Sequence, residues 1–330
     1  MSASSVKQLR ERWRTPAGRE LALEAAAWLA KGAVSDAPSW AATHEGRVDL
    51  RGLEFPSPAR VNSVVIANST FEVIGGFPVF AATRWEHIDL RASVIRHARF
   101  HDAWIHDCLF DQADLHDWRL WNSQVSDSSF ERADMTGSAI GTGERGANGV
   151  NRWHRVSFDR ADLKRAVVSE CDFVDCTFRN TKLKSVKFNY ATFDGVKFEG
   201  LLDGVLFEAR KFSDTRDPGP LKDVDFRGVL FRNCEMRAYK FENVQFDHEP
   251  GLRVIVDYAR VGTRALKMAA VSTDPIEQQV SGTIQHSLKL YSEGDTIYVP
   301  ADFVSAVGIE YAETLDRLYD RAQRELGLTV

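Results

Sequence analysis

Residues 90–140 read LRASVIRHARFHDAWIHDCLFDQADLHDWRLWNSQVSDSSFERADMTGSAI, and this stretch decides the fold. Every fifth residue in it is apolar: Leu90, Ile95, Phe100, Ile105, Phe110, Leu115, Leu120, Val125, Phe130, Met135 and Ile140. Two residues before each lies a second column of mostly small residues, with Ile88 and Trp118 as bulky exceptions. A helix repeats every ~3.6 residues and a strand every ~2. A period of five therefore predicts a solenoid built from a short repeat.

The repeat has a direct physical interpretation. If each pentapeptide makes one side of a square coil, the large apolar side chain fills the axis and the small one fits between neighbouring turns. The other three side chains face water, as Arg96-His97 and Glu131-Arg132 would. Four units then close one coil, and successive coils stack at the inter-strand spacing of about 4.8 Å.

The same period extends beyond this stretch in both directions. On the N-terminal side the predicted members, in ragged register, are Val48, Leu50, Leu53, Phe55, Ile66, Phe71, Phe80 and Trp85. The gap between Phe71 and Phe80 is one residue short, so we expect a bulge near Gly75-Gly76. On the C-terminal side we expect the repeat to resume at Phe158, to slip near Leu202, to break again before Pro220 and to end at Phe246. Predicted core residues are Phe100, Phe110, Leu115, Phe130, Phe158, Phe173, Phe178, Phe188, Cys108, Cys171, Cys176 and Cys234.

Four units carry a recognisable motif. They are Ala113-Asp114-Leu115, Ala133-Asp134-Met135, Ala161-Asp162-Leu163 and Cys171-Asp172-Phe173. These units resemble the A-(D/N)-L-x-x motif of the pentapeptide-repeat family. The resemblance covers most of the region from Val48 to Phe246 and implies an all-β solenoid, a right-handed quadrilateral β-helix. It says little about function, because members of the family do many things and mostly by binding.

Composition restricts the class of protein. The chain has 330 residues, 44% of them apolar, which is enough for a sizeable core. A net charge of -5 is mild and argues against a chain devoted to nucleic acid or to an anionic membrane. The sequence shows neither an apolar signal segment nor a long apolar run. We therefore expect a cytoplasmic protein with no direct contact to nucleic acid or membrane.

The pattern divides the chain into three parts. Residues 1–45 are predicted to form a helical N-terminal cap, with a partner-binding helix as the alternative. The start signal of the helix is Thr15-Pro16, its end is Gly32, and its apolar stripe is Leu21, Ala25, Trp28 and Leu29. Residues 46–248 form the β-helix, with loop insertions near 141–152 and 213–220. Residues 249–330 are predicted to be mainly helical. There Ile276–Tyr291 has helical spacing, Asp295–Val299 is a short extended piece, and Phe303–Leu326 is one long helix capped by Asp302 or an upstream residue. This C-terminal segment caps the last coil, forms a homodimer or recognises a partner.

Apparent motifs for catalysis or cofactor binding lack the surrounding structure that such sites need. Gly141-x-Gly143-x-x-Gly146 matches the dinucleotide fingerprint but lies between β-helix repeats, so we interpret it as a surface loop. Cys171 and Cys176 have no third metal ligand nearby, and all four cysteines share the small column, so we expect structural thiols without disulfides. His97, His101, His106 and His116 are expected on a wet surface near Asp102, Asp107 and Asp117, with a metal or pH-sensing site as the alternative. The sequence predicts no enzyme, no cofactor and no metal site.

Two groups of surface residues are candidates for a partner-binding surface. Trp104 and Trp121 occupy outward positions and suit an interface, unless they pack beneath a loop or terminal segment. Lys164 and Lys184 are twenty residues apart and should stack in one column, near Lys182 and Lys187. Acidic groups of a partner would relieve their repulsion; a solvated face is the alternative. Asp114 and Asp134, in the repeat motifs, complete the candidate surface.

Two functions remain. The first is a non-catalytic protein-binding scaffold. The second follows from the resemblance, because some family members mimic DNA, bind a type II topoisomerase such as DNA gyrase and protect it from quinolones or natural poisons. Mimicry needs a continuous acidic surface. The segment from Ile88 to Ile140 contains nine Asp/Glu and five Arg, but the segment from Trp153 to Phe212 contains nine Asp/Glu and eleven Lys/Arg. We therefore rank the general scaffold first.

Overall fold

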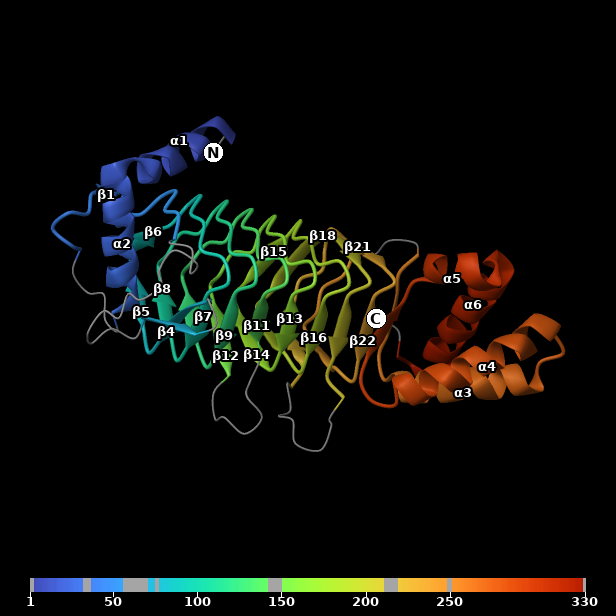
Figure 1. Ribbon diagram of the computed structural model, residues 1–330. Coiled ribbons are helices and arrows are strands. Elements are labelled where there is room, and N and C mark those ends of the chain that lie inside the picture. The colour runs from blue at the N-terminus through green and yellow to red at the C-terminus, as the bar shows by residue number, and fades with distance from the viewer. Residues whose placement is uncertain are drawn as a thin grey trace.

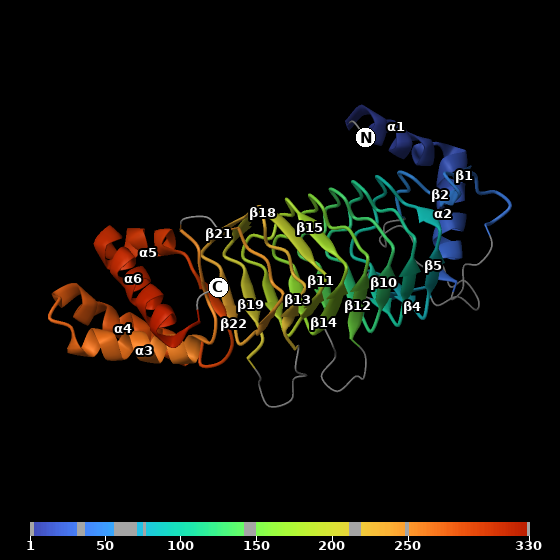
Figure 2. The ribbon, with the colours of Figure 1, turned by 180° about the vertical axis from the view of Figure 1, so that it is seen from behind.

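The computed structural model describes residues 3–31, 37–55, 71–74, 77–141, 150–210, 219–247 and 251–328. The molecule is a rod of stacked short strands with helices at both ends (Figure 1). The view from behind shows the N-terminal and C-terminal helices at opposite ends of the rod (Figure 2). No helix in the described ranges combines the length and apolar character needed to cross a bilayer.

Parallel strands twenty residues apart stack on one another, as Ile105 on Val125 does, so four pentapeptides make one coil. One long side is a nine-stranded sheet in the order β22 (Glu235–Arg237), β19 (Leu206–Glu208), β16 (Lys187–Asn189), β13 (Val167–Ser169), β11 (Ala139–Gly141), β9 (Arg119–Trp121), β7 (Arg99–His101), β4 (Phe77–Ala81), β3 (Phe71–Ile74). The next side is an eight-stranded sheet in the order β23 (Phe241–Glu242), β20 (Leu221–Lys222), β17 (Thr192–Asp194), β14 (Cys171–Val174), β12 (Asn151–His154), β10 (Gln124–Ser126), β8 (Trp104–His106), β5 (Arg84–Glu86).

The other two sides are held mostly by single bridges between coils. They also contain two small sheets: β1 (Thr43–His44), β2 (Arg47–Asp49), β6 (Ile88–Asp89), and β15 (Thr177–Arg179), β18 (Lys197–Asp203), β21 (Val229–Arg232). We call the side bridged through Glu54, Val94, Asp114, Asp134, Asp162 and Lys182 the second side. This stacking of parallel strands twenty residues apart, four pentapeptides to a coil, is the β-helix predicted from the sequence.

The predicted central and small columns fill the axis of the rod. Phe100, Phe110, Leu115, Phe130, Phe158, Phe173, Phe178, Phe188, Cys108, Cys171, Cys176 and Cys234 are all buried. Successive coils stack ring on ring, as Phe178 does between Phe158 at 4.9 Å and Phe198 at 5.0 Å. Such stacked aromatic pairs add about 0.5–1.5 kcal/mol each beyond the burial of their area.

Three details of the predicted repeat are wrong. Phe71 does not continue the coil, because β3 pairs antiparallel with β4 in a hairpin, with Phe71 opposite Phe80. The repeat resumes at Asn151–Trp153, before Phe158, since buried Trp153 takes a central position beside Val125. After the second break it resumes at Leu221, before Phe226. The predicted member Ile66 and the glycines at 75 and 76 lie outside the described residues.

The N-terminal helices pack on the first coil. They are α1 (Ala3–Glu11), η1 (Arg12–Arg14) and α2 (Pro16–Ala30), and α2 begins at the predicted Thr15 cap, whose hydroxyl accepts from Gly18 N. Ala25 and Leu29 of the predicted stripe are buried, together with Ala22, Ala26 and Ala30, whereas Leu21 is exposed. The predicted helix end, Gly32, is outside the described residues. Residues 43–49 form a hairpin, so the segment before residue 45 is not helical throughout.

The C-terminal unit has its own core. It comprises β24 (Arg253–Ile255), α3 (Tyr258–Val271), α4 (Pro275–Leu290), β25 (Thr296–Tyr298), α5 (Pro300–Val307) and α6 (Ile309–Leu326). The single helix predicted over 303–326 is wrong, because Gly308 divides it into α5 and α6. Of the two predicted caps, the upstream one is observed: Val299 takes the N-cap position of α5, without a side-chain cap hydrogen bond, and the carboxylate of Asp302 accepts from Asn233 N at 2.7 Å. The sequence analysis did not find α3.

Candidate protein interface

The outward positions of each pentapeptide supply the surface side chains. Trp104 lies half-buried on β8 of the eight-stranded sheet, with the Arg84 guanidinium 4.0 Å from its ring centre and His106 stacked at 5.2 Å. Trp121 lies half-buried on β9 of the nine-stranded sheet, stacked at 4.4 Å on His101. The two indoles therefore lie on two sheets that meet at one corner, and each packs on side chains of its own sheet.

The two breaks in the repeat fall at this same corner. The first lies between β11 of the nine-stranded sheet and β12 of the eight-stranded sheet. The second lies between β19 and β20, which belong to the same two sheets. A regular coil turns this corner within one pentapeptide. Both insertions after Ile140 thus border the eight-stranded sheet, whereas the one-residue slip near Leu202 falls on β18, between the pairs Phe178–Phe198 and Phe188–Phe207.

The outer face of the eight-stranded sheet is hollowed. A hollow of about 560 Å³ lies over β10, β12, β14, β17 and β20, and we call it the central hollow. Its rim carries Arg152, Asp172, Asp194 and Lys222, while Ser126, Val174 and Thr192 are short. Arg152 lies 3.6 Å from Asp172, and Lys222 lies 2.8 Å from Asp194. The sequence did not predict this hollow, because Ser126 and Val174 share one outward column with His154, while Thr192 lies in another with Arg152, so no run of short side chains marks it.

Asp114, Asp134, Lys164 and Lys184 lie elsewhere, along the second side and its edge. Asp114, Asp134 and Asp162 stack in consecutive coils, and Lys182 follows them. The Lys164 ammonium lies 3.6 Å from Asp162 and the Lys184 ammonium 3.3 Å from Asp203. Acidic groups of the chain itself therefore compensate the lysine column, without a partner.

The acidic members of the second side are also partnered. Asp114 pairs with Arg96, and Asp134 accepts from Thr136. Burial opposes ionisation of Asp162, but the Lys164 N–H and the Lys182 ammonium outweigh it and hold the pKa of that carboxyl below its usual value. The structure thus brings four of the six predicted surface residues to the second side and its edge, and it places the two tryptophans on two other sides that meet at one corner.

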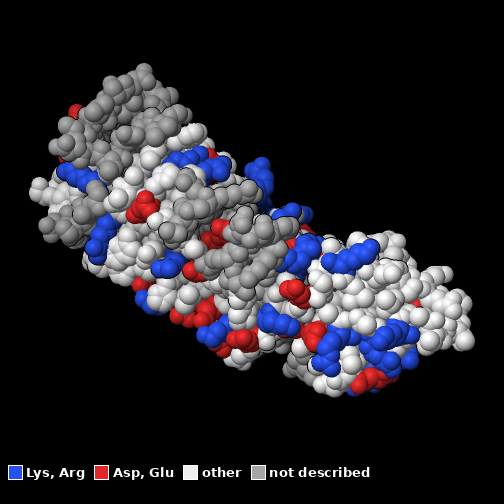
Figure 3. Space-filling model, turned by 90° about the horizontal axis from the view of Figure 1, so that it is seen from below, with Lys and Arg blue, Asp and Glu red and all other residues white. Residues whose placement is uncertain are grey.

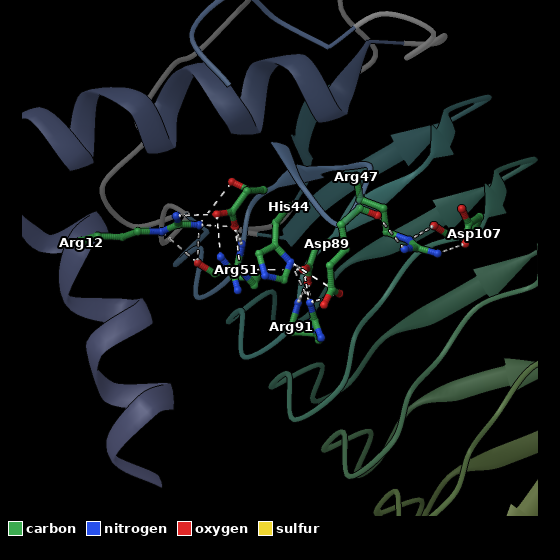
Figure 4. Close-up of polar contacts among 9 residues, drawn as sticks. Arg12, His44, Arg47, Arg51, Asp89, Arg91 and Asp107 are labelled. Carbon is green, nitrogen blue, oxygen red and sulfur yellow. Dashed lines mark hydrogen bonds and ion pairs between the residues drawn. The ribbon is translucent and has the colours of Figure 1, made fainter. Parts of the chain in front are cut away.

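The predicted histidine surface forms contacts between coils. His97 lies 3.0 Å from Asp117, and His106 lies 3.3 Å from Asp127. A group with metal-ligand chemistry occurs at a different place, where His44, Glu45 and Asp89 converge. The Arg91 guanidinium lies 2.6 Å from Asp89 and 3.0 Å from His44 Nδ1, as Figure 4 shows. A cation already neutralises the buried carboxylate, so this arrangement favours an ion-pair network over metal binding.

The cysteines have the environment of core spacers. Cys108 and Cys176 donate to backbone carbonyls of the preceding coil, Trp85 O at 3.7 Å and Trp153 O at 3.3 Å. Burial raises the pKa of each of these two thiols to about 12. A thiolate is the form that attacks electrophiles and binds metals, so neither thiol is suited to either role near neutral pH.

Residues 161–200 match the family described as pentapeptide repeats, in eight copies. No curated protein matches the sequence. Among solved structures, a trypsin-treated form of QnrB1, a plasmid-mediated fluoroquinolone resistance protein, is 12% identical over 52% of this chain and 83% of its own, with a TM-score of 0.25. HetL, a protein involved in heterocyst differentiation regulation from the cyanobacterium Nostoc sp. Strain PCC 7120, is 13% identical over 51% of this chain and 86% of its own, with a TM-score of 0.16. Likenesses at these identities and TM-scores carry no argument about function.

Proposed function

The chain is a pentapeptide-repeat protein, and we propose that it is a non-catalytic scaffold that binds another protein through the outer face of its eight-stranded sheet. The observation that carries the proposal is the central hollow, bordered at one corner by both breaks in the repeat. A uniform solenoid presents equivalent sides. Two insertions at one corner are natural contact points on an otherwise regular scaffold and favour that side for a specific interaction.

The chemistry of the hollow favours a protein partner. Its rim alternates cations with anions, and its short side chains leave room for side chains of a partner. Protein interfaces combine such a polar rim with direct hydrogen bonds and half-buried aromatic anchors. Trp104, held by Arg84 on the same sheet, supplies such an anchor next to the hollow. A nucleic acid would require a surface dominated by cations.

The second hypothesis, a DNA mimic that binds DNA gyrase or another type II topoisomerase, requires a different surface. Anions must face outward without compensation along the rod. Figure 3 shows Lys and Arg interspersed with Asp and Glu along the face seen from below. Because cations neutralise most of the acids between Ile88 and Ile140, we place the topoisomerase function second.

Site-specific photo-crosslinking tests the scaffold proposal. A photoreactive amino acid replaces Gln124 or Arg152 in the central hollow, and Lys182 on the second side serves as the matched control; all three side chains are exposed. The expected result is a discrete crosslinked protein from the hollow positions alone, competed away by unlabelled chain. Crosslinking that is strongest at Lys182, or equal at all three positions, would place the interface elsewhere and reject the proposal.

A further inference from the structure

The last coil leaves one edge of β21 open. In the sheet β15-β18-β21, β18 pairs with β21 from Gly200 to Asp203, and within the described residues no strand pairs with the other edge of β21. Unpaired strand edges are templates for another strand. Native proteins cover such an edge or use it.

Two carboxylates already occupy part of this edge. In earlier coils the N–H groups along the second side donate to the next coil, as Met135 N does to Asp162 O at 2.9 Å. At β21 the carboxylate of Asp247 accepts from Gly228 N at 2.6 Å, and that of Asp302 on α5 accepts from Asn233 N at 2.7 Å. Side chains therefore take the place of the missing strand at both ends of β21.

Between these two caps one rung is free. In an earlier coil the residue equivalent to Phe231 is Leu163, whose N–H donates to Lys182 O of the next coil at 3.1 Å. The residue equivalent to Val229 is Ala133 in another coil, and its carbonyl accepts from Asp162 N of the next coil at 2.9 Å. Neither the Phe231 N–H nor the Val229 carbonyl has such a partner among the residues that the structure describes. A strand laid beside β21 would satisfy both groups.

The free rung faces a groove. The groove has a volume of about 450 Å³ and runs between β21 and α5, with Leu252, Val299, Ala301 and Ser305 on the side opposite the strand. That volume falls within the range of about 300–1,000 Å³ typical of ligand sites. At ~3.3 Å per residue, an extended segment of about four residues matches the length of β21.

The side chains at the rim define what the segment should carry. Leu201 and Leu230 pair across β18 and β21, and Leu230 is 60% exposed. An apolar residue beside Leu230 would extend this ladder. The exposed Arg232 guanidinium has no ion pair with any described residue, so an acidic residue of the segment would complement it.

We propose that an extended peptide segment of a partner protein, with an apolar and an acidic residue two positions apart, binds as an added strand along β21 in the groove beside α5. The Phe231 N–H donates to the peptide, and a peptide N–H donates to the Val229 carbonyl. A helix has no free backbone groups to meet this rung, whereas strand addition uses main-chain hydrogen bonds for affinity and side-chain pockets for specificity. This site is distinct from the central hollow and does not depend on it.

Selection of peptides on the full chain tests the proposal. A phage-displayed library of random heptapeptides is panned on the immobilised protein, and synthetic copies of the enriched peptides are measured by fluorescence anisotropy. Ser305→Trp fills the groove, and Ala306→Trp, on the same helix but outside the groove lining, is the matched control. We expect Ser305→Trp to weaken binding at least about tenfold and Ala306→Trp to change it less than about twofold.

Two further readouts exclude other modes of binding. Arg232→Gln should weaken acidic peptides by about threefold, as expected for an exposed ion pair. Amide hydrogen exchange of the segment 228–233 should slow when peptide is added. Failure to enrich any peptide, binding that survives Ser305→Trp, or unchanged exchange at 228–233 would each overturn the proposal.

Discussion

Each position in the pentapeptide has one physical task. The central and small columns could be predicted from the sequence because the central residue is apolar in every unit from Leu90 to Ile140 and the second column is small in most of them. The backbone conformation at the corners of the coil could not be predicted. Corner residues such as Ala92, His97 and Asp102 adopt positive φ values of 61°, 60° and 52°, yet few of these corner residues are glycine. A left-handed residue costs about 1–2 kcal/mol. The inter-coil hydrogen bonds impose this angle, so no local sequence signal announces it.

Thiol reactivity tests the placement of the small column. The four cysteines are buried, and Cys234, in the last complete coil, is slightly more exposed than the others. At about pH 8 we expect the folded protein to react only slowly with a disulfide reagent, because burial raises the pKa of these thiols. Peptide mapping by mass spectrometry should find Cys234 modified first. Denaturation in guanidinium chloride should expose all four, and rapid reaction of Cys108 or Cys176 in the native protein would contradict their burial.

At the scale of elements, interactions with the first coil hold the N-terminal helices. The Arg12 guanidinium donates to Asp49 at 2.8 Å and 3.0 Å, and Trp13 Nε1 donates to Arg51 O at 2.8 Å. Gly52, at φ +71°, allows the backbone of Leu9 to approach where a Cβ would lie within 2.5 Å of it. Figure 4 shows Arg12 and Arg51 at this junction. The sequence indicated a cap but not these contacts, because they join residues about forty positions apart.

Acid should loosen this junction. Burial opposes ionisation of Asp49, but hydrogen bonds from Arg51 and Arg12 outweigh it and hold the pKa of that carboxyl well below its usual range. A depressed folded-state pKa contributes stability that is complete above the unfolded value near pH 4 and is lost as pH falls toward the folded value. Asp49→Asn should therefore cost about 2 kcal/mol at neutral pH, and less at about pH 3.

Thermal unfolding of wild type and variant at both pH values measures this effect. Glu54→Gln is the matched control, because Glu54 pairs with Arg14 of the same helical segment at an exposed site. The control should change stability by less than about 1 kcal/mol. Equal losses for the two variants, or a loss for Asp49→Asn that does not shrink in acid, would show that Asp49 does not hold the cap.

Two elements show why sequence patterns fail at the ends of the repeat. Phe71 has the right residue type for the coil, but an antiparallel hairpin with β4 competes for it. The stripe from Phe303 to Leu326 has helical spacing throughout, but Gly308, at φ +86°, ends one helix and precedes the next. In both cases tertiary pairing or one backbone angle overrides a correct periodicity. The central hollow was also hidden, since it arises from side-chain lengths across five coils.

For the whole molecule, charge pairing decides between the two functional hypotheses. Six of the acidic residues between Ile88 and Ile140 contact an arginine: Asp89, Asp107, Asp114, Asp117, Asp127 and Glu131. The other three, Asp102, Asp111 and Asp134, accept from neutral side chains. The acidic excess counted in the sequence therefore does not become a continuous negative surface.

From this compensation we expect no mimicry of DNA. Titrated into a DNA gyrase supercoiling assay, the wild-type protein should neither inhibit the enzyme nor protect it from a quinolone, even in large excess. A variant with Arg96→Gln, Arg155→Gln and Arg160→Gln removes one arginine partner from each of Asp114, Asp127 and Glu131 while keeping exposed side chains of similar length. If the arginine partners of these acidic residues are the reason that the wild type does not affect gyrase, the variant should inhibit supercoiling at lower protein concentrations than the wild type does. Inhibition or rescue by the wild type near stoichiometric amounts would instead establish topoisomerase binding and reverse the order of the two hypotheses.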